Sequence, residues 1–229
     1  TLQWKDWLSE PALSLVAPSP STSMPQTTPS SPAPEPSVKS RSKPPPSPFR
    51  SGSPTTSEHD LRLAGVFEDM QDLQLLKTPA EGLHFAAQIL KKNIPCDAIG
   101  AYLYDINANK FRLVAAEGEQ AERHTGEAIT SDTGLFQLVS IHQEEPYAFD
   151  NVTQDPRYVV TSDGLLQPNP QTMLLMPLTY DHISLGALQL VNRNDAPTFD
   201  VHDKNILAYV AKQLAHFVHS ARIRLMNAP

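Results

Sequence analysis

The order of elements in the sequence predicts an α+β fold with a central antiparallel sheet. Helical periodicity dominates the two ends of the folded part, residues 60–93 and 200–225, whereas most of the strand-like runs lie between them. Four of these runs form two pairs, each joined by a short polar turn, as in β-hairpins. An antiparallel sheet needs cover on one face, and the terminal helices are available for it. We therefore expect these helices to pack on one side of the sheet.

The first 57 residues differ in composition from the rest of the chain. Thirteen of the 22 prolines precede residue 55, serine is abundant, and apolar residues are almost absent after Val16. Such a segment cannot bury enough surface to offset the entropy of ordering. We expect residues 1–57 to be a disordered linker, kept extended by its prolines. Residues 58–226 are then expected to form one domain, with its core in residues 78–221.

The N-terminal segment of the linker carries both tryptophans of the chain. Trp4, Trp7 and Leu8 fall on one face of a helical turn. One interpretation is a short motif that folds against a protein partner. The other is the end of an upstream domain, because the sequence begins with threonine and is expected to be a fragment of something longer.

Two helices are expected before the sheet. Apolar residues recur at spacings of three and four over residues 60–77, which is typical of an amphipathic helix. Thr78 and Pro79 provide an N-cap and a first-turn proline for a second helix. This helix is expected to end near Asn93, because Pro95 cannot continue it.

The middle of the chain alternates strands with one helix. The expected strands are residues 98–104, 111–116, 127–130, 146–149, 172–179 and 183–192. A helix over residues 133–142, capped by Asp132, is expected between the third and fourth strands. Residues 150–170 are expected to be a long loop with at most one turn.

The closing helix, residues 200–225, carries a heptad pattern of apolar residues. Together with apolar positions of the first helix, this pattern predicts a seam through which two copies of the chain form a homodimer. The seam residues are Leu63, Phe67, Met70, Leu207, Val210, Leu214 and Phe217.

Charge and cysteine content exclude several classes of protein. Residues 1–57 carry a net charge of +2, which leaves −9 on the folded part. An acidic domain lacks the basic surface that nucleic-acid binding requires. One cysteine cannot form an intrachain disulfide or a multi-cysteine zinc site, and it suits a reducing, cytoplasmic location. No apolar run approaches the length of a membrane span, so no membrane association is expected.

Five short blocks of the sequence form an ordered pattern, namely Asp132-Thr133-Gly134, Glu145-Pro146, Asp155-Pro156-Arg157-Tyr158, Thr172–Leu178 and Leu185–Arg193. In their order and spacing these blocks resemble the GAF domain family. The resemblance implies a fold like that of GAF and PAS domains, with the terminal helices on one face of the sheet and a pocket on the other. It also implies a regulatory, sensory role in signal transduction.

Within that family the chain resembles the regulatory GAF domains of cyclic-nucleotide phosphodiesterases. Those domains carry an Asn-Lys pair, then a Phe, then an Asp-Glu pair. The corresponding residues here are Asn192, Arg193, Phe199, Asp203 and Lys204, so that Arg replaces Lys and Lys replaces Glu. In the family this motif supports the pocket without touching the ligand, and the resemblance implies the same role here.

The resemblance also implies which residues would bind a ligand. The family's contact positions correspond to Gly100, Ile129, Thr130, Asp155, Tyr158 and Thr172. This set suits a purine such as that of a cyclic nucleotide, because a tyrosine can stack on a base and an aspartate can accept from an amine or a ribose hydroxyl. The backbone amides of residues 132–135 could hold its phosphate. A pocket that is filled, or kept only for packing, is the open alternative.

Catalytic residue patterns are not found in the sequence. Cys96 is expected to be structural, because a single cysteine cannot run the disulfide cycle of free-methionine-sulfoxide reductases, which share this fold. The spacing of His216 and His219 could bind a metal, but a solvated helix face is the favoured interpretation. His142 is the one candidate for a haem ligand. We expect no enzymatic activity and no metal, haem or bilin.

Two functions therefore remain open. The first is a sensory domain that binds a small molecule, such as a cyclic nucleotide, and signals through its terminal helices. The second is a ligand-free interaction and dimerisation module that acts as a scaffold, with the proline-rich arm recruiting a partner.

Overall fold

The computed structural model describes residues 58–140 and 145–227 of the chain. The expected linker, its tryptophan segment and His142 lie outside these residues. The predictions made for them stay predictions.

Within the described residues, six strands form one antiparallel sheet in the order β3-β2-β1-β6-β5-β4. The strands are β1 Cys96–Asp105, β2 Lys110–Glu117, β3 Ala128–Thr130, β4 Tyr147–Phe149, β5 Met173–Tyr180 and β6 Ile183–Arg193. The first hairpin pairs Gly100 with Ala116, and the last pairs Met176 with Leu188. The α+β fold predicted from the sequence is confirmed, and all six predicted strands are present.

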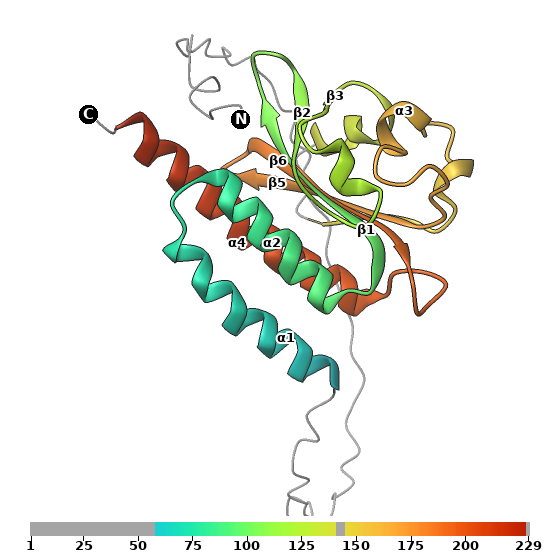
Figure 1. The fold of residues 1–229 in the computed structure, drawn as a ribbon, viewed down its shortest axis with the longest axis horizontal. Coiled ribbons are helices and arrows are strands. Elements are labelled where there is room, and N and C mark those ends of the chain that lie inside the picture. Colours follow the sequence, from blue (N-terminus) through green and yellow to red (C-terminus); the bar gives the residue numbers. More distant parts are fainter. Residues whose placement is uncertain (1–57, 141–144, 228–229) are drawn as a thin grey trace, which may run out of the picture. The chain divides into compact units, whose positions relative to one another are not determined.

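The terminal helices cover one face of this sheet, as expected (Figure 1). They are α1 Glu58–Asp69, the 3-10 helix η2 Met70–Leu75, α2 Pro79–Asn93 and α4 Val201–Met226. Leucine, valine and alanine side chains of α2 and α4 pack on the sheet in one apolar core. Figure 1 shows α2 and α4 next to the sheet and α1 farther from it.

Local sequence explains where α2 and α4 begin. Thr78 accepts a hydrogen bond from the Glu81 N–H at 3.2 Å, and the Glu81 carboxylate accepts from the Thr78 N–H, which makes a capping box. Asp200 and Asp203 form the corresponding box at the start of α4. These reciprocal bonds satisfy orphan N–H groups of both first turns.

The first helix differs from its prediction. One helix was expected over residues 60–77, but the α-helix ends at Asp69 and a 3-10 helix follows. Because a 3-10 helix has three residues per turn, Met70 and Leu73 both face the core, and both are buried.

The opposite face of the sheet is covered by short elements and loops (Figure 1). They are η3 Ala121–His124, η4 Gly134–Ser140, η5 Val152–Gln154 and α3 Val160–Asp163. A second apolar core lies between these elements and the sheet. The expected α-helix over residues 133–142 is thus a 3-10 helix in its described part, and the expected loop 150–170 contains two short helices.

Candidate functional site

The centre of the sheet face opposite the helices is filled by side chains of the chain itself. Gly100 lies on β1 at the position expected to contact a ligand. A Cβ added there would lie 2.8 Å from Cδ1 of Leu166 and 2.9 Å from Cε2 of Tyr102. Leu166 is 1 % exposed and Tyr102 is fully buried. The space above Gly100, where the predicted pocket would open, is therefore occupied.

A buried chain of hydrogen bonds crosses the same face. The Tyr102 hydroxyl donates to Oε1 of Gln189 at 2.7 Å, and Nε2 of Gln189 donates to the Asp163 carbonyl oxygen at 3.0 Å. Burial raises the pKa of Tyr102 well above its ordinary value, so the phenol stays a neutral donor. These bonds tie β1, β6 and α3 together across the space that a ligand would need.

The Asp163 carboxylate occupies the start of η4. It accepts from the N–H of Leu135 at 3.0 and 3.1 Å and from the N–H of Val159 at 2.8 Å. The missing side chain of Gly134, whose φ is +65°, allows this approach. Burial raises the pKa of Asp163, and the backbone hydrogen bonds act in the opposite direction.

The position of Asp163 changes two expectations from the sequence. Asp132 was expected to cap this helix, but it is exposed, and the carboxylate that binds the Leu135 amide comes from α3. The amides of residues 132–135 were expected to hold a phosphate. In the structure a negative group of the chain already binds there.

The six residues expected to bind a ligand lie in different environments. Ile129 and Thr172 are buried, Gly100 is covered, and Thr130 is exposed. All six lie in the described part of the chain, where no side-chain hydrogen bond joins any two of them, although the Tyr158 N–H donates to the Asp155 carbonyl oxygen at 2.9 Å. Their assignment as ligand contacts stays a prediction.

Asp155 and Tyr158 lie three residues apart in the loop, and their side chains have different environments. Both Asp155 oxygens bind the Arg157 guanidinium, at 2.9 and 2.7 Å, and this pair holds the pKa of Asp155 at about 2. The Tyr158 hydroxyl is buried against Gly164 and has no hydrogen-bond partner in the described part of the chain. Tyr158 packs against the second apolar core, and the Asp155 carboxylate is bound to Arg157.

The motif predicted to support the pocket does join several elements. Arg193 at the end of β6 binds the buried Asp203 of α4 at 2.9 Å and the Pro95 carbonyl at 3.1 Å. Asn192 accepts from the N–H of Gln171 at 2.6 Å. Phe199, between them and α4, is buried in the helix-side core. These residues fix the start of α4 to the strand ends.

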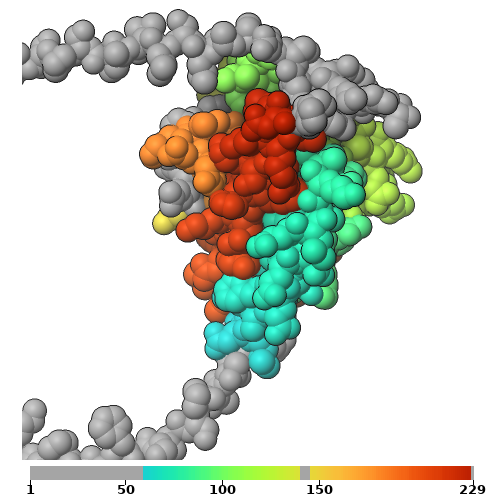
Figure 2. Space-filling model, turned by 90° about the vertical axis from the view of Figure 1, so that its left-hand side faces the viewer, coloured from blue at the N-terminus to red at the C-terminus, as the bar shows by residue number. Residues whose placement is uncertain are grey.

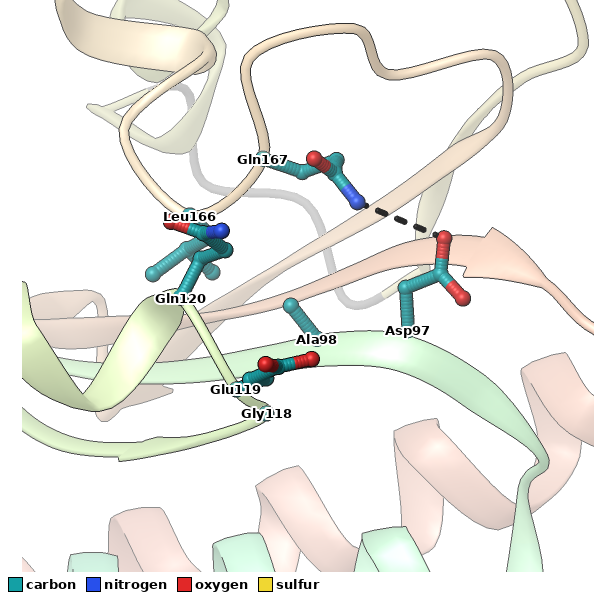
Figure 3. Close-up of a pocket in the computed structure, with 7 residues that line it drawn as sticks. All are labelled: Asp97, Ala98, Gly118, Glu119, Gln120, Leu166 and Gln167. Atoms are coloured by element: carbon teal, nitrogen blue, oxygen red, sulfur yellow. Dashed lines mark hydrogen bonds between the residues drawn. The ribbon is translucent and has the colours of Figure 1, made fainter.

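A pocket lies beside the starting end of β1 (Figure 3). Its volume is about 320 Å³. The residues that line it are Asp97, Ala98, Gly118, Glu119, Gln120, Leu166 and Gln167. Of these, none was singled out from the sequence as a site residue.

The chain was compared with known families and structures. The family model described as "GAF domain" matches residues 79–217, which is more than half of the chain. The chain belongs to the GAF domain family. A comparison with curated protein sequences gives no match.

Solved structures share the fold of this GAF domain. The GAF domain of a phosphoenolpyruvate-protein phosphotransferase from Coxiella burnetii has a TM-score of 0.64 at 19 % identity, over 74 % of this chain and 99 % of that one. Free methionine-R-sulfoxide reductase from Neisseria meningitidis, solved with its substrate, has a TM-score of 0.61 at 18 % identity, over 73 % and 94 %. The GAF-B domain of DevS from Mycobacterium smegmatis gives 0.51 at 18 %, over 66 % and 99 %. Such identities show the fold alone.

One of these neighbours, the free methionine-R-sulfoxide reductase, is an enzyme. Cys96 is buried on the helix side of the sheet. Desolvation raises the pKa of its thiol to about 12, despite the opposing effect of Lys91. A thiol with this pKa is almost entirely protonated at neutral pH and is a poor nucleophile.

The histidines with metal-ligand spacing pack on an aromatic ring. The ring of His219 stacks on Tyr180 at 4.2 Å, and that of His216 meets it edge-on at 5.4 Å. Across residues 58–140 and 145–227, no three His, Cys, Asp or Glu side chains gather where they could hold a metal ion. Nor is any helix in those ranges long and apolar enough to cross a bilayer.

Sequence reasoning missed the residues that fill the interior. Asp163 and Leu166 lie in a segment expected to be a loop, and Gln189 and Tyr102 lie in strands expected to be apolar. A polar residue inside an otherwise apolar strand, as at Gln189, was the one signal that a buried hydrogen bond would form there.

Proposed function

We propose that this chain is a non-catalytic regulatory GAF domain that acts as a ligand-free interaction and dimerisation module. The observation that carries the proposal is the filled interior. Leu166 and Tyr102 cover Gly100, and Asp163 occupies the amides at the start of η4. With this interior filled, we place the signalling contact on the outer surface of the helices.

The helical face supports this proposal with exposed apolar side chains. Leu61 is 62 % exposed and Phe67 is 41 % exposed on α1, and Val201 is 60 % exposed at the start of α4. The Phe67 ring meets the half-buried Tyr209 ring of α4 edge-on at 4.3 Å, so aromatic side chains join the two helices at this surface. Figure 2 shows α4 in red beside the N-terminal helices in teal on this face.

Most of the predicted seam is used inside the chain. Leu207, Val210, Leu214 and Phe217 are buried in the helix-side core, and so is Met70. Leu63 is half-buried and packs against that core. Of the seam residues, Phe67 is the one that is exposed. We therefore place the dimer contact on the outer side of α1 and on the neighbouring surface of α4.

Sedimentation velocity of the full chain at tens of micromolar tests the dimer. The double variant Leu61→Ser, Phe67→Ser removes apolar area from the proposed contact and is expected to convert the dimer to a monomer. Ile106→Ser is the matched control, because Ile106 is 76 % exposed in the turn between β1 and β2, outside the proposed contact. A monomeric unchanged protein would contradict the proposal.

The sensory alternative requires a different conformation of the loop 159–172. A cyclic nucleotide over the sheet would have to displace Leu166 from Gly100 and the Asp163 carboxylate from the Leu135 amide. The sensory alternative is supported by the Asn192–Arg193 motif, whose side chains bind Asp203 and the Gln171 N–H. Thermal shift of the full chain with millimolar cyclic AMP and cyclic GMP separates the two functions, because only the sensory domain is stabilised.

The state of Cys96 bears on where the chain works. A buried, reduced thiol at Cys96 suits the cytoplasm, which is where we propose that the chain works.

A further inference from the structure

The helices at the proposed dimer contact carry opposite charges. Residues 58–75, which form α1 and η2, include five acidic residues and one arginine, whereas α4 includes four Lys and Arg residues and one acid, Asp203. Asp203 is buried and bound to Arg193, so the Lys, Arg, Asp and Glu residues that α4 leaves exposed or half-buried are all basic. We infer that two copies of this chain pack in parallel, with α1 and η2 of each copy against α4 of the other. The inference rests on the dimer proposed above and adds its arrangement.

Within one copy, α1 and α4 run in the same direction. The His59 ring stacks on the His202 ring at 3.8 Å near the start of both helices. Further along both helices, the Phe67 ring meets the Tyr209 ring at 4.3 Å. Figure 1 shows the same course, with both helices running from the lower right to the upper left. These two contacts fix which residues of α1 and α4 lie at the same height along the helix axes.

A two-fold axis can bring this face of two copies together in two ways. With the axis perpendicular to the helices, α1 meets α1 of the second copy and α4 meets α4, so acid faces acid and base faces base. With the axis parallel to the helices, α1 and η2 of each copy meet α4 of the other, so acid faces base in both contacts. Opposite charges across an interface favour association, whereas like charges oppose it. The charges of this chain therefore select the parallel arrangement.

The parallel arrangement brings specific charges to the same height. Rotation about an axis parallel to the helices leaves the height of every residue unchanged. Lys212 follows Tyr209 by less than one helical turn, and Glu68 and Asp72 follow Phe67 by one and five residues, so Lys212 of one copy is level with the stretch between Glu68 and Asp72 of the other. All three side chains are exposed, and none of them forms an ion pair with another residue of the described part of the chain. They are therefore available to a second copy.

Apolar side chains of the same segment provide area for the contact. Leu61 near the start of α1 is 62 % exposed, and Leu75 at the end of η2 is 77 % exposed. Ala64, between them, is exposed and small, so it does not hold another helix away from α1. Burial of the leucines favours association in either arrangement, because the hydrophobic effect has no direction. The choice between the two arrangements therefore depends on the charges.

Sedimentation velocity of charge-reversed full chains tests the arrangement. The double variant Glu68→Lys, Asp72→Lys places positive charge opposite Lys212 of the second copy, twice in each dimer. Its dimer Kd is expected to rise at least about tenfold above that of the unchanged protein at low salt. Adding Lys212→Glu to the same chain restores opposite charges in both contacts, and the Kd is expected to return to within about threefold of the unchanged value.

The matched control is Glu119→Lys, Glu122→Lys, which changes the net charge equally at two exposed acids outside the proposed contact. Its Kd is expected to stay unchanged, and circular dichroism shows that each variant is folded. In an antiparallel dimer the α1 variant would leave the Kd unchanged, because base would face base where acid faced acid. That result, or equal weakening by the control, would overturn the parallel arrangement and leave the dimer standing. A monomeric unchanged protein would instead overturn the proposed function itself.

Discussion

Replacing Leu166 by alanine removes the side chain that closes the space above Gly100. Leu166 is 1 % exposed, and its Cδ1 contacts the sheet where a Cβ of Gly100 would stand. Truncation of a buried leucine costs roughly 2–5 kcal/mol, depending on how far the site relaxes. Leu166 lies in a loop beside a pocket, so some relaxation is expected, and we predict a loss of about 2–3 kcal/mol.

Urea denaturation followed by circular dichroism measures this loss. The midpoint concentration is expected to fall while the m-value stays unchanged, because the surface exposed on unfolding hardly changes. Leu166→Met serves as the control, since a swap that conserves volume costs less than about 1.5 kcal/mol. If Leu166→Ala and Leu166→Met lose the same small amount, Leu166 does not fill the interior and the reasoning fails.

The remaining predictions concern charge, capping and close contacts. Arg157→Ala should raise the pKa of Asp155 from about 2 toward its ordinary value, as read from an NMR carboxyl titration. The ion pair stabilises the fold above the ordinary Asp pKa, and this contribution is lost as the pH falls toward 2. The variant should therefore be less stable than the unchanged protein at neutral pH, and an equally large difference near pH 2 would contradict the prediction. Asp163→Ala leaves the buried Leu135 N–H and the half-buried Val159 N–H without their acceptor and should cost roughly 2–4 kcal/mol by urea denaturation; a neutral effect would refute that role. In Gly186→Ala the added Cβ would clash with the Tyr102 carbonyl oxygen of β1, so this variant should fold poorly or not at all. In Gly65→Ala the Cβ has open space, and the variant should stabilise α1 by about 0.5–1 kcal/mol in thermal unfolding. Similar effects of the two alanines would contradict the close-approach argument.

The elements predicted well from the sequence are those with local signals. The helix 79–93 has its own capping residues at one end and a proline at the other, and the structure gives the same bounds. The last hairpin was found because two apolar runs flank a polar turn, whose Asp181 and His182 have φ of +48° and +61°. Such signals lie within a few residues of the element that they define.

The filling of the interior could not be predicted in this way. The carboxylate that binds the start of η4 comes from Asp163, 28 residues beyond Leu135. The four-residue helix α3, Val160–Asp163, is too short to show a period. Leu166 was one apolar residue in an expected loop, and nothing adjacent in the chain indicates that it lies over Gly100. Family resemblance indicated a pocket, whereas long-range packing decides whether it is open.

The motif predicted to support a pocket has a structural role even though the interior is filled. Asn192 and Arg193 hold β5, β6 and α4 together whether or not a ligand lies above the sheet. Their bonds contribute to the scaffold, and Asn192 also holds Asp97 at the pocket shown in Figure 3. The presence of this motif therefore does not by itself imply nucleotide binding.

The closed interior is tested most directly by methyl NMR of the full chain during titration with cyclic AMP and cyclic GMP. The methyl groups of Leu166 and Met173 lie in the core over the sheet and report on any molecule that enters. We predict that their signals stay unchanged up to about 5 mM of either nucleotide, well above the Kd expected of a functional site. Saturable shifts of both methyl signals would show that the interior opens, and would contradict a ligand-free module.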